Sequence, residues 1–347
     1  MTETRKADHI RICLVEDTQA REVTTGLEDV HLLHRALPEI ARNDVDLSSS
    51  LFGHRLAVPM VIEGMTGGTR EAAAINAVLA EAAERFGLAM GVGSQRAALE
   101  SPELAYTYRI ARERGPNVFL MANLGLAQIL KDDWEAKVGR AVEMIEADAL
   151  CVHVNALQEA VQKEGETDFK GAVERLKEVA STTSVPVIVK ETGAGIASEE
   201  AWLLEEARVA GIDIGGAGGT SWSAVESHRQ QGSSQEASLA RTFWDWGIPT
   251  ATAVRNIAAL RSSASPFTLI ASGGINSGID IAKCVALGAD LCASARPVLM
   301  ALHRSGKAGL RALFAQWAQE LRGAMFLTGS PTLEALRHVP LVRVNTP

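Results

Sequence analysis

The sequence has few cysteines, no long apolar run and no excess of positive charge. Its four cysteines, Cys13, Cys151, Cys284 and Cys292, are scattered and contain no Cys-x-x-Cys pair. This spacing indicates neither a zinc site nor a disulfide framework, so we expect reduced, partly buried thiols. No stretch approaches the roughly 20 apolar residues of a membrane helix, and residues 1–9 lack the apolar core of a signal peptide. We therefore expect a cytoplasmic protein with no membrane partner.

The charge balance is acidic, with 34 Lys and Arg against 42 Asp and Glu and a formal net charge of -8. A nonspecific nucleic-acid binder needs a clustered positive surface to neutralise phosphates, so we expect no nucleic-acid partner. The acidic net charge does not exclude local basic pockets that bind small anions. Hydrophobic residues at 47% suit a soluble globular protein with a sizeable core, and 347 residues fit one large α/β domain or two smaller ones.

Short apolar runs that end in glycine or a small polar residue recur eight times along the chain. They cover 58–64, 88–93, 118–123, 149–155, 186–191, 212–216, 268–273 and 291–295. Between most of them, apolar residues recur at three- and four-residue intervals, which is typical of amphipathic helices. These helical patterns cover 70–86, 102–114, 134–146, 168–180, 198–210 and 277–287. Strands alternating with helices in this way predict an α/β fold, a closed parallel (β/α)8 TIM barrel.

An open, doubly wound sheet is the main alternative to the barrel. Such a sheet usually carries a Gly-x-Gly-x-x-Gly turn after its first strand. Here the turn reads Gly64-Met65-Thr66-Gly67-Gly68, which does not fit that pattern. The sequence therefore favours the barrel.

Two segments depart from an even barrel. Residues 1–57 precede the first strand and contain clustered ionisable groups, among them Lys6 and His9. We expect them to form an N-terminal extension that folds over the barrel mouth and contributes to the substrate site, with 58–347 as the catalytic barrel. The second is an insertion after the sixth strand, where polar residues 227–238 form either a lid or a mobile surface loop.

Glycine-rich loops follow three of the predicted strands. Gly273-Gly274 follows the seventh strand and Ser294-Ala295-Arg296 the eighth, and barrels bind phosphate groups at this pair of loops. After the sixth strand, 215–222 contains four glycines beside Thr220, which lets a flat ring or a phosphate rest against bare backbone. Glycines that only turn the chain are the alternative interpretation.

Basic side chains stand at the ends of other strands. Lys190 ends an apolar strand, so its side chain should point into the mouth and stabilise an anionic cofactor ring, unless it only pairs with Glu191 or a neighbouring carboxylate. Arg96 follows the second strand and, with basic groups of the extension, would hold a diphosphate-like group, unless it is a surface arginine. Two phosphorylated ligands are indicated, and flavin mononucleotide (FMN) fits the first of them.

The fourth predicted strand ends in the most distinctive polar cluster. His153, Asn155, Gln158 and Glu159 follow one another within a few residues. Together they offer a proton donor or acceptor, two amides and a possible metal ligand at the mouth of a parallel barrel. Few structural roles need all four, so this cluster is a candidate active site.

In these motifs the chain resembles the type 2 isopentenyl-diphosphate isomerases, which use FMN. The matching segments cover nearly the whole chain in order: Arg5-Lys6-x-x-His9, Met65-Thr66-Gly67-Gly68, Gly93-Ser94-Gln95-Arg96, Asn123-Leu124-Gly125, His153-Val154-Asn155, Gln158-Glu159, Val189-Lys190-Glu191, Gly216 to Trp222, and Ser272-Gly273-Gly274 to Ala295. The glycine motifs are shared with other FMN barrels, whereas the Gln-Glu pair after His-x-Asn is specific to this family. The resemblance implies a 1,3 proton shift that interconverts isopentenyl and dimethylallyl diphosphate.

The resemblance also assigns roles to residues. It implies FMN contacts by Met65, Thr66, Gly67, Ser94, Asn123, Lys190, Thr220, Gly273, Gly274, Ser294 and Ala295. It implies substrate contacts by Arg5, Lys6, His9, Ser94, Gln95, Arg96, Asn155 and Gln158. Gln158, His153 and Lys190 would be catalytic, and Glu159 would bind a Mg²⁺ ion that also meets the diphosphate. Reduced FMN would be the active form, with NADPH as reductant, in a homo-oligomer of four or eight subunits.

Some assignments stay open at this point. His153 is either a general base or only a hydrogen-bonding neighbour of the ring. An FMN barrel that oxidises 2-hydroxy acids is a competing function, but the chain has no His-Gly-Arg grouping for it. A noncatalytic flavin- or phosphate-binding protein is another, and the presence of Gln158, Glu159 and Lys190 counts against it. Ala156 and Gly215 depart from the family, which often has Pro and Ser or Ala there, without removing a group that the chemistry requires.

Overall fold

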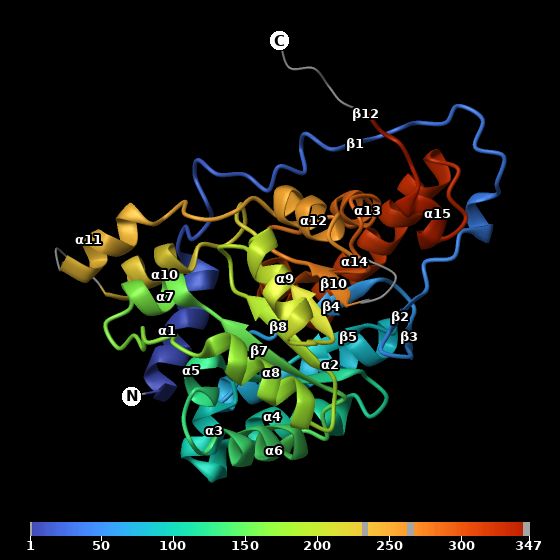
Figure 1. The fold of residues 1–347 in the computed structure, drawn as a ribbon. Helices are drawn as coiled ribbons and strands as arrows, with labels where there is room; N and C mark the ends of the chain where they lie inside the picture. The colour runs from blue at the N-terminus through green and yellow to red at the C-terminus, as the bar shows by residue number, and fades with distance from the viewer. Residues whose placement is uncertain (1, 231–234, 262–266, 343–347) are drawn as a thin grey trace.

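The fold is a closed barrel of eight parallel strands, with helices around it (Figure 1). The computed structural model describes residues 2–230, 235–261 and 267–342, with side chains from residue 6 onward. In barrel order the strands are β4 (Met60–Ile62), β5 (Ala89–Gly91), β6 (Leu120–Gly125), β7 (Ala149–Val154), β8 (Val187–Glu191), β9 (Gly211–Asp213), β10 (Thr268–Ala271) and β11 (Leu291–Ser294), and β11 pairs with β4 to close the ring. The predicted (β/α)8 barrel is confirmed.

The outer helices follow the strands in chain order. They are α2 (Arg70–Phe86), α3 (Arg96–Glu100), α4 (Tyr106–Arg114), α5 (Leu126–Ile129), α6 (Trp134–Met144), α7 (Ala156–Val161), α8 (Ala172–Thr182), α9 (Ser198–Glu206), α10 (Trp222–Arg229), α11 (Gln235–Thr242), α12 (Thr250–Ala258), α13 (Gly278–Ala286), α14 (Arg296–Leu327) and α15 (Leu333–Arg337). Short 3-10 turns cover Arg42–Asp44 and Pro102–Ala105.

Helix α2 shows how local sequence sets these boundaries. The Thr69 side chain accepts a hydrogen bond from the Ala72 backbone N–H, which caps the first turn. Gly87 ends the helix in the left-handed region at φ 61°, which glycine adopts without strain. One face of α2 buries small residues and Leu79 against the barrel, so packing of this face adds to the intrinsic helix preference of its alanines.

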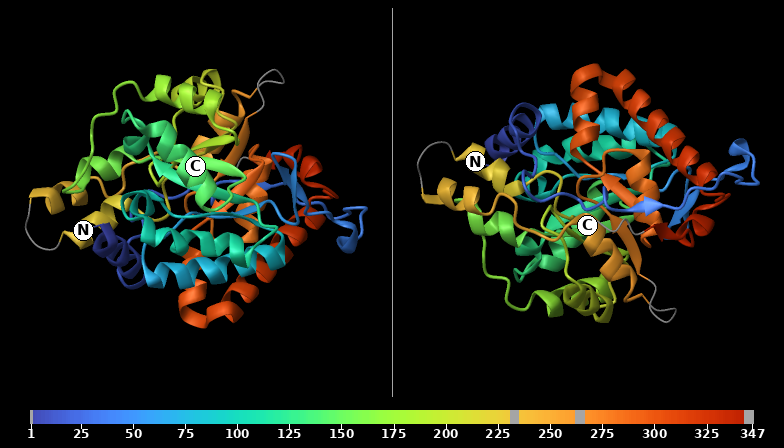
Figure 2. Two further views of the ribbon diagram at one scale, coloured as in Figure 1. Left: turned by 90° about the horizontal axis from the view of Figure 1, so that it is seen from below. Right: turned by 90° about the horizontal axis from the view of Figure 1, so that it is seen from above.

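A hairpin closes one end of the barrel. Strands β2 (Ser49–Leu51) and β3 (His54–Leu56) pair antiparallel. Leu51 and Leu56 are fully buried and join the apolar cluster inside the barrel, with Val61, Phe119 and Ile188 among its members. The hairpin therefore fills the end of the barrel that lies opposite the loops after the strands (Figures 1 and 2).

The first 57 residues consequently serve both ends of the barrel. Helix α1 (Thr2–Val15) packs against α10 and α14 at the mouth, and Figure 1 shows it beside α10 and α7. Further along, β1 (His31–Leu32) pairs with β12 (Leu341–Val342) on the outside, and the chain then reaches the hairpin. Only the first part of the extension thus lies at the predicted site.

The insertion after β9 forms helices at the mouth. Helix α10 packs against α1, α7 and α11, and the Ser221 side chain caps its first turn. Of the predicted lid or loop at 227–238, residues 231–234 lie outside the described part of the chain. In the parts that are described, this insertion is helical and continues the wall of the mouth.

Two expectations from composition concern the whole chain. All four cysteines lie in the described part, where none forms a disulfide; Cys13 is partly buried and the other three are buried. Among the described residues, no helix combines the length and apolar character needed to cross a membrane.

Candidate active site

A cavity of about 500 Å³ opens at the carboxyl ends of the barrel strands. Its size is typical of a small-molecule or cofactor site. Loops after five strands and helix α1 form its wall. Among the residues singled out from the sequence, the lining includes His9, Met65, Lys190, Thr220, Gly273, Gly274, Ser294, Ala295 and Arg296. The structure therefore brings together residues from the extension, the glycine loops and the lysine strand.

The glycine loops after β9 and β10 pack backbone against backbone. A Cβ added to Gly273 would lie 2.0 Å from the Gly216 carbonyl oxygen, and one added to Gly219 would lie 2.4 Å from the Gly274 nitrogen. Gly273 and Gly274 also have φ of 97° and 72°, where other residues are strained. The Thr250 hydroxyl donates a 2.7 Å hydrogen bond to the Gly273 carbonyl. This part of the wall is thus bare, fixed backbone.

Positive charge lines the cavity near the loop after β11. Arg296 begins helix α14 and donates through Nε to the Cys13 carbonyl of α1 at 2.9 Å. Arg304 also lines the cavity. Inside the loop, the Ser294 hydroxyl donates to the Ile275 carbonyl at 2.9 Å. Arg296 at a helix N-terminus, with Arg304 further along the same cavity wall, suits a phosphate group.

Lys190 lies in a buried cluster of three charged side chains. Its Nζ is 3.1 Å from Glu63 Oε2 and 3.6 Å from Asp213 Oδ2. Burial lowers the pKa of Lys190, but the carboxylates of Asp213 and Glu63 outweigh burial and hold that pKa above its usual range. The Ser272 hydroxyl donates to Asp213. Lys190 therefore pairs with two carboxylates and also lines the cavity, whereas its contact with a cofactor ring stays a prediction.

Glu191 is not the carboxylate that pairs with Lys190. Lys190 Nζ donates to the Glu191 backbone carbonyl at 3.1 Å. The Glu191 carboxylate instead accepts backbone N–H bonds from Gly193, Ala194 and Gly195. It thereby fixes the turn after β8, which forms another part of the wall.

Three predicted FMN residues lie behind the cavity wall. Gly67 packs on the Tyr108 ring, where an added Cβ would lie 1.9 Å from a ring carbon. Thr66 is buried, and its hydroxyl has no hydrogen-bond partner in the described part of the chain. Asn123 Nδ2 donates to the Val92 carbonyl at 3.0 Å, and Asn123 Oδ1 accepts from His153 Nδ1 at 2.8 Å. Among these three residues, Thr66 is thus the one whose side chain has an unmet hydrogen bond in the described part of the chain.

Helix α1 brings Lys6 to the second strand's loop. Lys6 Nζ donates to the Ser94 carbonyl at 2.6 Å and to the Tyr108 hydroxyl at 2.5 Å. The same hydroxyl donates to the Ser94 carbonyl at 2.8 Å. Burial raises the pKa of Tyr108, which keeps the phenol neutral. Arg5 is in α1, but its side chain lies outside the described part of the chain.

Gln95 and Arg96 have different surroundings. The Gln95 side chain is fully buried, donates to the Ala141 carbonyl at 2.8 Å and accepts from the Asn123 backbone N–H at 2.9 Å. It joins β6 to α6 and is not among the residues that line the cavity, and its contact with substrate stays a prediction. Arg96 is partly exposed and pairs with Glu100 and Glu166 at 2.8 and 3.2 Å.

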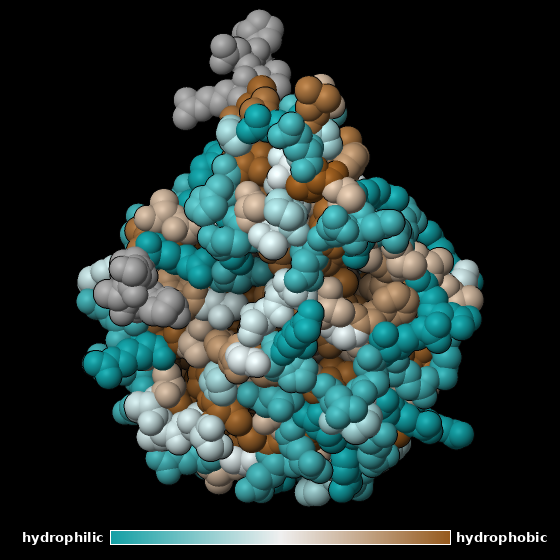
Figure 3. All heavy atoms as spheres, turned by 90° about the vertical axis from the view of Figure 1, so that its right-hand side faces the viewer, coloured by the Kyte–Doolittle hydropathy of each residue, from teal (hydrophilic) through white to brown (hydrophobic). Residues whose placement is uncertain are grey.

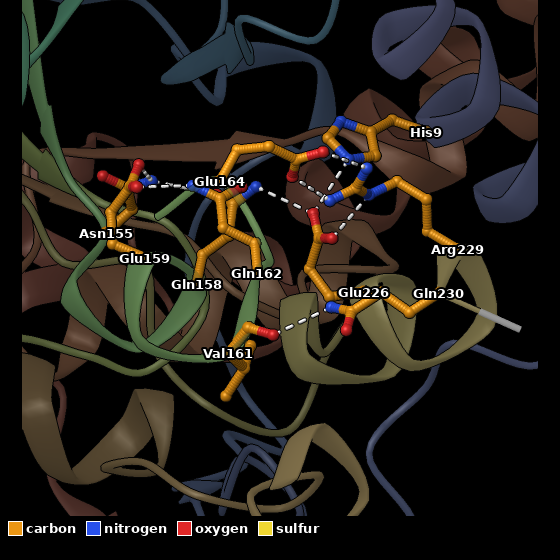
Figure 4. A network of polar contacts seen from close by, with 10 residues as sticks. All are labelled: His9, Asn155, Gln158, Glu159, Val161, Gln162, Glu164, Glu226, Arg229 and Gln230. Carbon is orange, nitrogen blue, oxygen red and sulfur yellow. Dashed lines mark hydrogen bonds and ion pairs between the residues drawn. The ribbon is translucent and has the colours of Figure 1, made fainter. Parts of the chain in front are cut away.

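The cluster after β7 meets helices α1 and α10 through Glu226 (Figure 4). Glu226 is fully buried, and its Oε1 accepts from His9 Nε2 at 2.9 Å and from Gln158 Nε2 at 3.4 Å. Arg229 Nε donates to Oε2 at 2.6 Å. Burial opposes its ionisation, yet the hydrogen bond and charge of His9 and the charge of Arg229 hold the pKa of Glu226 below its usual range. His9 also meets the Trp222 ring edge-on, with centroids 5.1 Å apart.

The carboxylate of Glu159 is held by its own loop. Oε1 accepts from Asn155 Nδ2 at 2.9 Å, and Oε2 accepts from the Glu166 N–H at 2.8 Å and from the Gln162 amide. Asn155 also donates to Gln158 at 3.0 Å. Among the described residues, no three His, Cys, Asp or Glu side chains gather as a ready metal site.

Sequence reasoning missed Glu226, Glu63 and Asp213. Glu226 lies in an insertion whose folding over the mouth could not be assigned from its pattern. Asp213 and Glu63 each sit at the end of a predicted strand, as Lys190 does, and this placement was the available signal. In parallel barrels, strand ends converge on one rim, so acidic residues there were candidates to meet the lysine.

Comparison with known proteins assigns the chain to a family. The family model for FMN-dependent dehydrogenases matches residues 112–343. An isopentenyl-diphosphate delta-isomerase of Nostoc sp. is 45% identical over 97% of this chain and 95% of its own length, and that of Methanosarcina barkeri is 43% identical over 98% and 92%. The chain belongs to the FMN-dependent, type 2 isopentenyl-diphosphate delta-isomerases. This membership bears out the resemblance inferred from the motifs.

Solved structures place this family's fold among flavoprotein barrels. A lactate oxidase of Pediococcus acidilactici aligns with a TM-score of 0.72 at 18% identity, covering 99% of this chain and 94% of its own. A mandelate oxidase carrying an FMN adduct aligns with a TM-score of 0.64 at 21% identity, covering 99% and 93%. At such identities the likeness concerns the barrel alone. The isomerase family thus shares its fold with oxidases of different chemistry.

Proposed function

We propose that the protein interconverts isopentenyl diphosphate and dimethylallyl diphosphate, using reduced FMN, for isoprenoid biosynthesis. The observation that carries this proposal is the juxtaposition at one mouth of a bare glycine wall, Lys190 and the group formed by His9, Gln158 and Glu226. The near full-length relatives named as isomerases support the same reaction.

The cavity fits FMN at both of the cofactor's ends. Arg296, Arg304 and the loops after β10 and β11 would hold the phosphate, and Lys190 with the Thr66 hydroxyl would meet the ring. A Cβ atom added to Gly273 or Gly219 would collide with the neighbouring loop, so the close packing of the loops requires glycine at these positions. When bound and reduced, FMN supplies a proton at ring nitrogen N5 and an electron-rich face to an unactivated alkene.

The chain's own residues bind and orient the substrate in this proposal. Gln158 positions the alkene, because an amide does not titrate near neutral pH and its Nε2 is tied to Glu226. His9, Lys6 and Arg96 contribute positive or hydrogen-bonding groups for the diphosphate. The ammonium of Lys190 balances negative charge on the reduced ring. We assign His153 to holding Asn123, rather than to proton transfer, because its Nδ1 is bonded there.

We further propose that Glu159 binds Mg²⁺ together with the substrate diphosphate. Mg²⁺ keeps several waters and takes one or two carboxylates plus phosphate oxygens, so a single protein carboxylate is sufficient. Asn155 and Gln162 hold that carboxylate in place. NADPH is the proposed reductant of FMN.

A cytoplasmic homo-oligomer, a tetramer or octamer, is also part of the proposal. Leu37, Trp202 and Trp246 are large apolar side chains that are exposed on the monomer, as a self-association surface would require. On the face drawn in Figure 3, apolar patches lie between hydrophilic side chains. Light scattering coupled to size-exclusion chromatography measures the number of subunits.

The decisive experiment is an anaerobic isomerase assay on the purified, yellow protein. We expect conversion of isopentenyl diphosphate only after NADPH or dithionite reduces FMN, and only with Mg²⁺ present. Equal turnover with oxidised FMN, or no turnover under reducing conditions, would contradict the proposed function. Lactate and mandelate serve as control substrates, and neither should be oxidised.

A further inference from the structure

Glu63 is a buried carboxyl group at the cavity that no assigned role explains. It follows β4 in the chain, and its side chain is 9% exposed. One oxygen, Oε2, contacts Lys190, whereas Oε1 is buried without a hydrogen-bond partner in the described part of the chain. Glu63 also lines the cavity, so a ligand there would lie against its side chain.

The charges around Glu63 do not cancel within the protein. Lys190 from β8 faces both Glu63 and Asp213, at 3.1 and 3.6 Å, so one ammonium serves two carboxylates. Cys151 from β7 is the other titratable group close enough to interact with Glu63. If both carboxylates are ionised, the cluster carries one net negative charge beside the cavity.

Buried polar atoms in folded proteins nearly always have a hydrogen-bond partner, and Glu63 Oε1 has none in the described part of the chain. The unmet oxygen of Glu63 therefore fits a polar ligand. The pyrimidine edge of an FMN ring carries one N–H donor between two carbonyl acceptors, so either ionisation state of Glu63 finds a complementary atom.

We propose that Glu63 is a cofactor-site residue: its free oxygen bonds the polar edge of the FMN ring, and its charge, shared with Lys190 and Asp213, sets the preference of the site for reduced over oxidised FMN. This inference rests on the proposed FMN function. An ionised Glu63 adds negative charge beside the ring and disfavours the anionic reduced form, whereas a neutral Glu63 does not.

The direction of the pH effect follows from the position of Glu63. Burial, followed by the neighbouring Asp213 carboxylate, raises the pKa of Glu63 to about 8, with Lys190 opposing the shift. Glu63 is then mostly neutral at pH 6.5 and ionised at pH 9.5. In the native protein, the preference for reduced FMN should fall across this interval by more than the free cofactor accounts for.

The test is a spectroelectrochemical titration of the holoprotein at several pH values between 6.5 and 9.5. The midpoint potential gives the ratio of affinities for reduced and oxidised FMN. We expect Glu63→Gln to match the native protein at pH 6.5 and to retain about tenfold more preference for reduced FMN at pH 9.5, which is the effect of one pKa unit of coupling. Superimposed native and E63Q profiles over the whole interval would overturn the inference.

Asp213→Asn is the second variant and keeps the test decisive if E63Q does not fold. It removes the carboxylate that raises the pKa of Glu63, so the fall in preference should move to lower pH. If the midpoint potential of D213N depends on pH as that of the native protein does, Asp213 does not share charge with Glu63. Failure of the purified protein to bind FMN overturns the proposed function itself, whereas normal isomerase activity with an unchanged E63Q profile removes only the role of Glu63.

Discussion

At the scale of single residues, Tyr108 connects two parts of the site that come from distant positions in the sequence. Its ring supports the turn at Gly67, and its hydroxyl both accepts from Lys6 and donates to the Ser94 carbonyl. The phenol thus fixes a lysine of the N-terminal helix against the second strand's loop. Removing the hydroxyl leaves the ring in place, which separates the two roles.

We expect Tyr108→Phe to raise KM for isopentenyl diphosphate about fivefold with little change in kcat. The lost hydrogen bond contributes about 1 kcal/mol to holding Lys6, and the change acts on binding rather than on the reacting carbons. Steady-state kinetics with the reduced enzyme measures both constants. An equal fall in kcat at unchanged KM would contradict this positioning role.

Gln158→Ala should keep FMN and lose most of the activity, by at least about tenfold. Its amide is tied to Glu226 and Asn155 and does not line the larger cavity, so the cofactor keeps its contacts. The visible spectrum and a turnover assay check the two parts. Gln230→Ala is the matched control, since Gln230 donates to the Val161 carbonyl at the end of α7. Equal loss in both variants would reassign Gln158 to supporting α7.

Prediction of single residues from the sequence succeeded where the end of one strand determines the position of the side chain. It failed where the side chain's partner comes from a distant part of the chain. Lys190 was placed at the mouth because it ends an apolar strand. For Gln95, one residue before Arg96, the local sequence did not reveal that its amide joins β6 to α6. Glu63 and Asp213 meet Lys190 only once the ring of strands has closed.

At the scale of elements, Glu226 ties helix α1 to helix α10. His9 from α1 donates to a carboxylate that Arg229 also neutralises, and the carboxylate is fully buried. The pKa of Glu226 in the folded protein lies below its usual range. The stabilisation from ionised Glu226 is therefore fully present above about pH 4.5, the ordinary glutamate pKa, and is lost as the pH falls through the lower pKa of the folded protein.

Glu226→Gln should loosen α1 without opening the barrel. We expect amide hydrogen exchange in residues 2–15 to rise about tenfold, while exchange in strands β6 and β7 stays unchanged, because losing a charged, buried partner costs on the order of 1–3 kcal/mol. Exchange measured by mass spectrometry gives both values. Glu164→Gln, which removes only the partly exposed partner of Arg229, is the control and should leave α1 protected.

Sequence pattern predicted elements better than it predicted their contacts. All eight strands and the helix at 70–86 occur where periodicity placed them, because alternation and apolar spacing are local properties. The hairpin at 49–56 was missed, since its two buried leucines, Leu51 and Leu56, matter only inside a finished barrel. The same holds for the pairing of β1 with β12, whose partners lie at opposite ends of the chain.

At the scale of the whole molecule, buried charge makes stability depend on pH. Folding raises the pKa of Glu63 from its ordinary 4.5 to about 8. A group whose folded pKa is raised contributes fully below its unfolded pKa, and the contribution is lost as pH rises through the folded value. The native fold should therefore lose stability between pH 4.5 and 8 through this residue.

Glu63→Gln should remove that loss. We expect the Tm of the variant, relative to the native protein, to rise steadily from pH 5 to pH 8.5, as differential scanning calorimetry would record. Glu164→Gln is again the control, because this carboxylate is 48% exposed and should show no such trend. A constant difference between E63Q and native protein at all pH values would mean that Glu63 stays ionised in the fold.

The long sequence separation between helix α1 and the helices that it packs against has a consequence for biosynthesis. Residues 2–15 are synthesised well before the helices that receive them, α10 and α14, which end at residues 229 and 327. The mouth must therefore stay uncovered while nearly the entire barrel is synthesised. Because a long connection joins α1 to the first barrel strand, α1 can dock without displacing any strand, so we expect FMN to enter an already folded barrel before α1 covers the entrance.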